Sequence, residues 1–224
     1  SALNHVVKCA GLSLGEYTAL VYAGAITFEE ALRLVQTRAQ AMHEAGQKFR
    51  GKMVTVIGME DQPLQDVCRK VACDTCAPVQ VSNFLFPKGR VIAGAPDAVD
   101  TVVSIIQSKE GITIKELAVS GAFHTELMQS ARVALVDCLC HIDIINPVIP
   151  VVANITGEPY KDAADIKAGL ANQLVDPVLW QNGIEHMVKT GIKVFYDMGP
   201  RSQLKTMNRH INRVAFKSTV SIEC

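Results

Sequence analysis

The feature that most constrains this chain is a glycine-flanked serine near its start, Gly11-Leu12-Ser13-Leu14-Gly15. An apolar, strand-like stretch precedes it at residues 6–10, and a helix-like stretch follows from Tyr17 to Tyr22. G-x-S-x-G between a strand and a helix predicts a nucleophile elbow. The glycines allow a turn too tight for side chains, which raises the Ser13 hydroxyl above the sheet edge. The backbone N–H of Leu14 then points at the oxyanion that forms when Ser13 attacks a carbonyl.

A serine nucleophile needs a base, and one of the six histidines is placed to serve. His124 follows a predicted strand that ends near Val119 and precedes a predicted helix that begins near Thr125. Strand ends are where open α/β folds place their sites. The positive end of the following helix would disfavour an imidazolium and keep the base neutral. Position alone leaves two interpretations open, a catalytic base and a buried structural histidine.

An arginine lies on the apolar face of the second predicted helix. This helix runs from Phe28 to about Gly46, and Thr27 and Glu30 form a capping box at its start. Its apolar stripe consists of Ala31, Leu34, Val35, Ala41, Met42 and Ala45. Arg38 falls within this stripe, where a guanidinium should cost several kcal/mol unless an anion meets it. The anion is either an internal Asp or Glu or a substrate carboxylate, which arginine binds in bidentate fashion.

The hydrophobic pattern divides the chain into two parts. Residues 51–120 read β-α-β-β-α-β, with strands at 53–57, 79–84, 90–93 and 112–119 and helices at 64–71 and 96–107. This order predicts a ferredoxin-like subdomain. Residues 1–50 and 121–224 form the larger body, with further helices at 126–140, 164–175, 180–190 and 203–212 and strands at 148–153 and 193–197. Alternating helices and strands predict a parallel sheet covered on both faces.

Composition excludes several classes of function. Lys plus Arg number 22, as do Asp plus Glu, so no overall charge favours nucleic acid or an anionic membrane. No apolar run approaches the roughly 20 residues that span a bilayer. The seven cysteines are an odd count, which indicates reduced thiols. Only Cys73 and Cys76 have the C-x-x-C spacing of a structural zinc site, so no metal site is predicted.

Several motifs together resemble the malonyl-CoA:acyl-carrier-protein transacylase family. They are Gly11-Leu12-Ser13-Leu14-Gly15-Glu16-Tyr17, Arg38, Ala122-Phe123-His124 and Gln173-Leu174. The stretches Ser82–Pro87, Val119–Thr125 and Gly199-Pro200-Arg201 look most like the mitochondrial form. The resemblance runs from about Val6 to about Met207. It implies an α/β-hydrolase-like body with a ferredoxin-like insert.

The resemblance also implies roles for individual residues. Ser13 would be acylated, His124 would be its base, and Arg38 would hold the free carboxylate of the malonyl group. A glutamine at the position of Gln173 orients the histidine in this family through its backbone carbonyl, so that a dyad replaces the carboxylate triad. The family's asparagine near the site corresponds to Asn83.

The substrate preference follows from the same comparison. Ala122-Phe123-His124 is the form associated with malonyl, and the bulk of Phe123 would crowd an additional α-methyl group, although such discrimination rarely exceeds a few kcal/mol. The implied reaction moves a malonyl group from CoA to the phosphopantetheine thiol of holo acyl carrier protein, for fatty acid synthesis. It needs no metal or redox cofactor. By resemblance alone, the expected location is the mitochondrial matrix.

The acyl carrier protein partner suggests a docking surface. Acyl carrier proteins are acidic, so their docking surface should be basic. Lys205, Arg209 and Arg213 recur at four-residue spacing, with Arg201 and Lys217 nearby, and are expected to line one helix face. Such charge runs are also common on faces that only contact solvent.

The sequence departs from the family in two places. Most relatives have a histidine where this chain has Leu12. The family also has a long segment before the elbow that supplies strands and a second oxyanion donor, so the N-terminal part of this chain is expected to be missing. Loss of one such donor typically costs about 100- to 1,000-fold in rate.

Two other functions therefore stay open. One is a serine hydrolase or thioesterase, in which a carboxylate such as that of Asp137, Asp162 or Asp176 would orient His124. The other is a non-catalytic binder of CoA or carrier protein.

Overall fold

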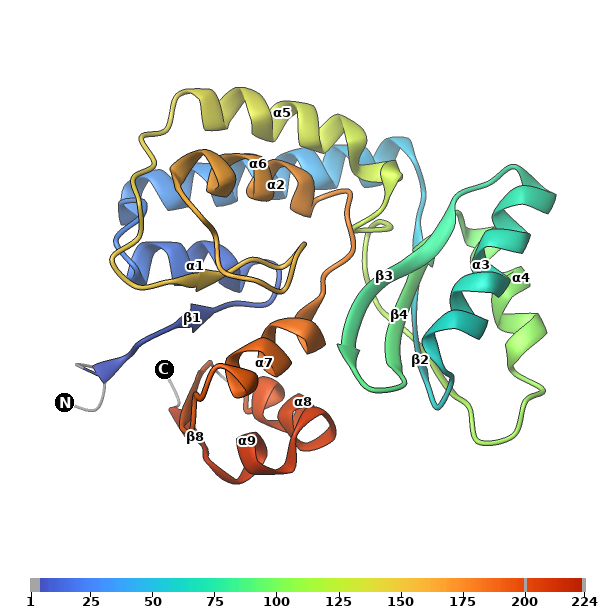
Figure 1. The fold of residues 1–224 in the computed structure, drawn as a ribbon. Coiled ribbons are helices and arrows are strands. Elements are labelled where there is room, and N and C mark those ends of the chain that lie inside the picture. Colours follow the sequence, from blue (N-terminus) through green and yellow to red (C-terminus); the bar gives the residue numbers. More distant parts are fainter. Residues whose placement is uncertain (1–4, 200, 223–224) are drawn as a thin grey trace.

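The computed structural model describes residues 5–199 and 201–222. The chain ends at 1–4 and 223–224, and Pro200 of the Gly199-Pro200-Arg201 motif, lie outside the described residues. Two parts lie side by side in Figure 1. We call Lys52–Glu116 the four-stranded unit, and the rest of the described chain the body.

The body is built mainly of packed helices. Four of its helices share one apolar core: α1 (Gly15–Tyr22), α2 (Phe28–Lys48), α5 (Gln129–Cys140) and α6 (Ala163–Gln173). Helices α2, α5 and α6 lie together at one side of α1 (Figure 1). Strand β1 (Cys9–Ala10) pairs in parallel with β6 (Val151–Val152) beneath them. The parallel pair places the elbow serine at the end of β1 and directly before α1.

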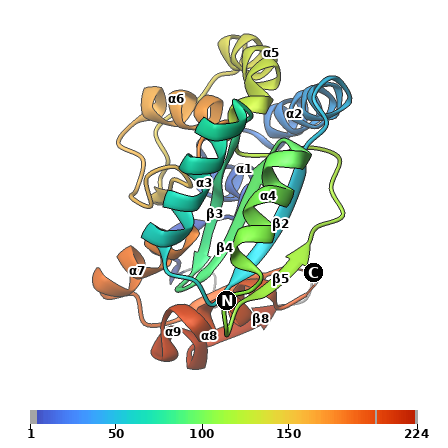
Figure 2. The ribbon, with the colours of Figure 1, turned by 90° about the vertical axis from the view of Figure 1, so that its right-hand side faces the viewer.

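The four-stranded unit has the element order that the sequence predicts. Its strands are β2 (Lys52–Ile57), β3 (Val79–Phe86), β4 (Gly89–Gly94) and β5 (Thr113–Glu116), and its helices are α3 (Asp61–Thr75) and α4 (Pro96–Ile106). The strands form an antiparallel sheet in the order β3-β4-β2-β5. Helices α3 and α4 cover one face of this sheet, as Figure 2 shows.

The sheet has two apolar faces because successive side chains of a strand point to opposite sides. Val54, Val56 and Ile92 belong to the core beneath α3 and α4. Met53, Val91 and Ala93 face the other way and pack with Ala122, Phe123 and Leu127 of the body. The second face therefore holds the segment that contains His124.

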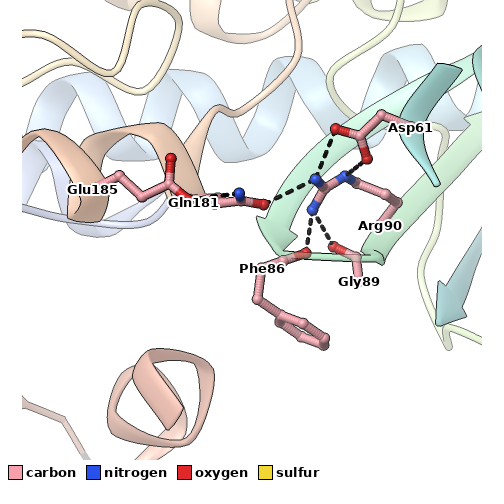
Figure 3. A network of polar contacts seen from close by, with 6 residues as sticks. All are labelled: Asp61, Phe86, Gly89, Arg90, Gln181 and Glu185. Atoms are coloured by element: carbon pink, nitrogen blue, oxygen red, sulfur yellow. Dashed lines mark hydrogen bonds and ion pairs between the residues drawn. The ribbon is translucent and has the colours of Figure 1, made fainter. Parts of the chain in front are cut away.

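A buried arginine connects the four-stranded unit to the C-terminal part of the body (Figure 3). Arg90 of β4 donates from Nε and Nη2 to the two carboxylate oxygens of Asp61, at 2.7 and 2.9 Å. Its Nη1 donates to the carbonyls of Phe86 and Gly89, and Nη2 also donates to Oε1 of Gln181, at 2.8 Å. One side chain thereby joins the β3–β4 hairpin, the start of α3, and α7 (Trp180–Lys189).

The C-terminal part forms a small layer of its own. It contains α7, β7 (Phe195–Met198), α8 (Gln203–Ile211), α9 (Arg213–Lys217) and β8 (Thr219–Ile222). Strands β7 and β8 pair in parallel. The sequence analysis did not predict α9 or β8. Lys205, Arg209 and Arg213 were expected on one helix face. Helix α8 ends before Asn212, however, and Arg213 begins the separate helix α9.

The parallel strands are shorter than predicted and less continuous. Residues 6–10 and 148–153 were expected to be strands, but only Cys9–Ala10 and Val151–Val152 are paired. In the described residues, the parallel pairs β1–β6 and β7–β8 belong to separate two-stranded sheets. The predicted helix over 126–140 opens with a 3-10 turn at Glu126–Met128. None of the helices in residues 5–199 and 201–222 is both long and apolar enough to cross a membrane.

Candidate active site

Ser13 lies in a turn that depends on a glycine. A Cβ on Gly11 would come within 1.9 Å of the Gly15 backbone, so no larger residue fits there. Ser13 itself has a φ of 50°, a left-handed conformation that is uncommon outside glycine. Its N–H donates to Oδ1 of Asn154 at 2.7 Å. The next N–H, that of Leu14, finds no acceptor within the described part of the chain and is free to bind an oxyanion.

His124 contacts Ser13 in the geometry of a serine–histidine dyad. The Ser13 Oγ and His124 Nε2 atoms are 3.0 Å apart. His124 Nδ1 lies 2.6 Å from the backbone oxygen of Gln173. A carbonyl can only accept, so Nδ1 holds the ring proton and Nε2 is left to accept the proton of Ser13. This tautomer is the one that a general base requires.

Burial keeps the imidazole neutral. His124 is 4% exposed, and its removal from water lowers its pKa to about 4. The hydrogen bond to Gln173 raises the pKa, and the nearby charge of Arg38 lowers it further. Near pH 7 the side chain is therefore an uncharged base.

Arg38 lies at the centre of the site and forms no ion pair within the described residues. The side chain is 7% exposed, and its Nη2 donates to Ser13 Oγ at 2.7 Å and to Gln173 Oε1 at 3.4 Å. Its Nε has no hydrogen-bond partner, and no carboxylate of the described residues forms an ion pair with it. Burial lowers the pKa of the guanidinium, while Tyr17 and Glu16 act in the opposite direction. Of the two anions that the sequence left open for Arg38, an internal Asp or Glu is not found as an ion-pair partner in residues 5–199 and 201–222.

Gln173 joins these groups from the last residue of α6. Its carbonyl holds His124, and its side-chain Nε2 donates to the backbone oxygen of Ser13 at 3.0 Å and to Oε2 of Glu16. The side chain is fully buried. The structure thus brings Ser13, His124, Arg38 and Gln173 together from four separate segments.

Asn83 and Phe123 lie nearby without hydrogen bonds to the dyad in the described structure. Asn83, in β3, forms a bridge with Val178, and its Oδ1 accepts from the hydroxyl of Ser82 at 2.8 Å. Phe123 is half-buried against both the helical core of the body and the second face of the four-stranded sheet. Their predicted roles toward substrate stay predictions.

Residues 7–220 match the family of the acyl transferase domain. The chain belongs to the acyl transferase domain family. It is 35% identical to the probable mitochondrial malonyl-CoA-acyl carrier protein transacylase of Drosophila melanogaster, over 99% of this chain and 61% of that relative. The chain therefore spans about three fifths of that relative's length.

Solved structures of acyl transferase domains are also similar. The malonyl CoA-acyl carrier protein transacylase of Coxiella burnetii matches with a TM-score of 0.90 and 35% identity, over 98% of this chain and 69% of that one. A malonyl-transacylase in complex with its type II polyketide acyl-carrier protein matches with a TM-score of 0.90 and 32% identity, over 97% and 69% of the two chains. The mixed α/β fold of this chain is thus the fold of these transacylases.

Two buried polar residues of this acyl transferase domain, Glu16 and Asn154, were not predicted from the sequence as part of the site. Asn154 is 4% exposed and contacts the elbow, while Glu16 is fully buried behind Gln173. The sequence contains a feature that could have identified each residue. Glu16 directly follows the elbow motif, on a helix whose core-facing neighbours are apolar, and Asn154 is a lone amide directly after an apolar strand.

The described residues contain no group of three His, Cys, Asp or Glu side chains that could hold a metal ion. The six cysteines among them are unpaired, and Cys224 lies outside the described residues.

Proposed function

We propose that this chain is an acyltransferase that moves a malonyl group from CoA to the phosphopantetheine thiol of acyl carrier protein, for fatty acid synthesis. The observation that carries the proposal is the environment of Arg38. A buried guanidinium without an ion pair is costly. That of Arg38 forms none among the described residues, and its Nη2 lies 2.7 Å from Ser13 Oγ. A substrate that brings its own carboxylate to the serine would offset that cost. The names of the similar transacylases support malonyl as that substrate.

The first half-reaction acylates Ser13. The hydroxyl oxygen attacks the thioester carbonyl of malonyl-CoA while Nε2 of His124 takes its proton. The N–H of Leu14 stabilises the oxyanion of the tetrahedral intermediate. When this intermediate collapses, the C–S bond breaks and His124 returns the proton to the leaving thiolate of CoA. Arg38 holds the malonyl carboxylate throughout, which orients the thioester carbonyl toward Ser13.

The second half-reaction reverses these steps with a different thiol. His124 removes the proton of the carrier protein's phosphopantetheine thiol, whose sulfur attacks the malonyl ester of Ser13. The ester bond breaks, and Ser13 recovers its proton from His124. The reaction is a ping-pong acyl transfer in which the two residues and the backbone donor handle every charge that develops. We propose no metal or redox cofactor for it.

The contacts of His124 argue against a serine hydrolase with a carboxylate triad. The backbone oxygen of Gln173, at 2.6 Å, occupies the position at Nδ1 where a triad has its acid. The three aspartates considered from sequence make other contacts. The Asp162 side chain caps α6, and none of the three carboxylates hydrogen-bonds to His124 within the described residues.

We further propose the finer architecture that this reaction would use. Residues 1–50 and 121–224 would be an α/β-hydrolase-like body, supported by the elbow between β1 and α1 and by the parallel β1–β6 pair. Residues 51–120 would be a ferredoxin-like subdomain, supported by the antiparallel order β3-β4-β2-β5 with both helices on one face. The mitochondrial form among the relatives supports a location in the mitochondrial matrix.

The carrier protein would dock on a basic patch formed by α8 and α9. The patch consists of Arg201, Lys205, Arg209, Arg213 and Lys217, and residues 198–222 contain no Asp or Glu. None of the five side chains forms an ion pair within the described residues. A local field of this kind attracts an acidic partner even on a chain of zero net charge.

A transfer assay tests the proposed function. The chain is incubated with malonyl-CoA, with and without holo acyl carrier protein, and both malonyl-carrier protein and free malonate are quantified. We expect malonyl-carrier protein as the main product and little malonate without the acceptor. Release of malonate at the same rate with and without carrier protein would identify a hydrolase instead.

A further inference from the structure

Behind the dyad lies a buried carboxylate that the proposed mechanism does not use. Glu16, in the first turn of α1, is fully buried and accepts three hydrogen bonds. Its Oε1 accepts from the backbone N–H of Asn154 at 2.9 Å and from the hydroxyl of Tyr160 at 2.8 Å, and its Oε2 accepts from Nε2 of Gln173. Burial raises its pKa to about 7, and these three donors act in the opposite direction.

The Glu16–Gln173 contact reaches His124. The same Nε2 of Gln173 donates to Glu16 and, at 3.0 Å, to the backbone oxygen of Ser13. The backbone oxygen of Gln173 holds Nδ1 of His124. Glu16 therefore fixes Gln173, which contacts both the nucleophile and the base.

Asn154 holds the other side of the elbow. Its Oδ1 accepts from the N–H of Ser13 and its Nδ2 donates to the carbonyl of Gly11, both at 2.7 Å. These two bonds clamp the turn on either side of the serine, whose φ of 50° needs such support. They also occupy the N–H of Ser13, while the N–H of Leu14 has no acceptor among the described residues.

We infer that Glu16 and Asn154 are positioning residues that act as one unit, because the N–H of Asn154 donates to Glu16. Asn154 fixes the backbone of the nucleophile and selects Leu14 as the oxyanion donor. Glu16 fixes Gln173 and, through it, the ring of His124. That losing these contacts would slow acyl transfer rests on the proposed function. The contacts themselves do not depend on which acyl group Ser13 carries.

Glu16→Gln is the sharpest variant because it breaks one link and keeps the side-chain shape. With the new amide oxygen at the Oε1 position, the bonds from Asn154 and Tyr160 remain. The new NH2 group then faces the NH2 group of Gln173, so that two donors meet. Rotating the amide of Gln173 does not relieve this, because its oxygen would then face the carbonyl of Ser13. Tyr160→Phe is the matched control, since it removes one hydrogen bond to Glu16 and leaves the Gln173 link intact.

The test uses two measurements that would not change if Glu16 only contributed to stability. The first is the rate at which a fluorophosphonate, which contains neither a carboxylate nor a thioester, forms an ester with Ser13 and releases fluoride. The second is the downfield proton NMR signal of Nδ1–H in His124. We expect Glu16→Gln to react at least about tenfold more slowly and to shift or lose this signal, with Tyr160→Phe close to the wild type in both. Asn154→Ala should also react more slowly.

Two results would overturn the inference. One is a Glu16→Gln variant that reacts at the wild-type rate with an unchanged Nδ1–H signal. The other is equal slowing in Glu16→Gln and Tyr160→Phe in step with equal losses of melting temperature, which would indicate general destabilisation. The probe also separates this inference from the proposed function. A wild-type chain that reacts with the fluorophosphonate but forms no malonyl ester would refute malonyl transfer, while the comparison of variants would still decide the role of Glu16.

Discussion

Ser13 and His124 both have left-handed backbone conformations, with φ values of 50° and 60°. Two other non-glycine residues of the described chain share this conformation, and both lie where it is common, at a helix end and in a hairpin turn. Cys76 ends α3, and Lys88 lies in the β3–β4 hairpin turn. At Ser13 and His124 the same strain instead holds two side chains toward each other. Strain of this kind persists only where the surroundings enforce it, and here Asn154 and Gln173 do so.

The Arg38 guanidinium, which forms no ion pair among the described residues, leads to a prediction about substrate preference. Arg38→Ala should lower kcat/KM for malonyl-CoA by roughly 10- to 100-fold, because a charge-assisted hydrogen bond to the substrate is lost. Acetyl-CoA has no free carboxylate, so its kcat/KM should change much less. The ratio of the two values measures the effect. Arg33→Ala, which removes an exposed arginine of the same helix, is the control. A malonyl-to-acetyl ratio that does not change in Arg38→Ala would refute the carboxylate clamp.

The raised pKa of Glu16 predicts how its contribution to stability changes with pH. Its pKa is about 7 in the folded chain and 4.5 in the reference state, so the folded state binds more protons between these values. The contribution is complete below pH 4.5 and is lost as the pH rises through 7. The free energy of unfolding of the wild type minus that of Glu16→Gln should therefore fall by about 3 kcal/mol across this range. Denaturant unfolding at several pH values measures the difference.

His124 changes the stability in the opposite direction with pH. Because its pKa is lowered in the folded chain, its contribution to stability is lost as the pH falls from 6.5 through 4. It is present in both proteins, but loss of the Gln173 hydrogen bond in Glu16→Gln would lower the pKa of His124 further in the variant. The His124 contribution therefore adds to the fall of the difference with rising pH and does not oppose it. A difference between wild type and Glu16→Gln that grows with pH would contradict the buried, proton-binding carboxylate.

The helices and the four-stranded unit could be predicted because their signals are local. The capping box of Thr27 and Glu30 and the apolar stripe of α2 gave that helix almost to the residue. The short strands β1 and β6 gave weaker signals, since each has only two paired residues. Strand β8, with four residues, and helix α9, with five, are also short and were missed. Their pairing and packing depend on neighbours that a local pattern does not reveal.

Arg90 is one of the links between the β3–β4 hairpin and the body, beside the backbone hydrogen bonds of Ser82 and Phe84 with Val178 (Figure 3). Arg90→Met should lower the free energy of unfolding by about 2 kcal/mol, because the carbonyls of Phe86 and Gly89 lose their donor. The Asp61 carboxylate is 44% exposed and can be hydrated, which limits the cost. Chemical denaturation measures the change.

Lys52→Met is the matched control for Arg90→Met. It removes two ion pairs with exposed carboxylates, those of Asp100 and Glu116, and should cost less than about 1 kcal/mol. Equal destabilisation by the two substitutions would show that the Arg90 network adds nothing beyond a surface ion pair.

The four residues of the candidate site come from the elbow, α2, the segment after β5 and the end of α6. From the residues alone, the sequence predicted the elbow and flagged Arg38 as a buried charge, but it left His124 undecided. The resemblance to the family was needed to associate His124 and Gln173 with Ser13, because these residues lie far apart in the sequence and contact one another only in the folded chain. Asn154 was missed for the same reason, since its bond to Ser13 spans 141 positions.

The basic patch on α8 and α9 predicts a separation of the two half-reactions. Reversing Lys205 and Arg209 to Glu should weaken turnover with acyl carrier protein, because the partner is attracted by the local field. Acylation of Ser13 by malonyl-CoA should stay unchanged, since neither residue contacts the dyad. Steady-state kinetics with varied carrier protein and single-turnover acylation measure the two steps. An equal loss in both steps would discredit the patch as a docking surface.

The most direct test of the account is the intact mass of the purified chain after incubation with malonyl-CoA, beside Ser13→Ala and Arg38→Ala. The account predicts one malonyl adduct on the wild type, none on Ser13→Ala and much less on Arg38→Ala. The ester forms at Ser13 Oγ, and Nη2 of Arg38, which lies 2.7 Å from that atom, holds the malonyl carboxylate. A folded wild-type chain without an adduct, or an adduct that persists in Ser13→Ala, would contradict it.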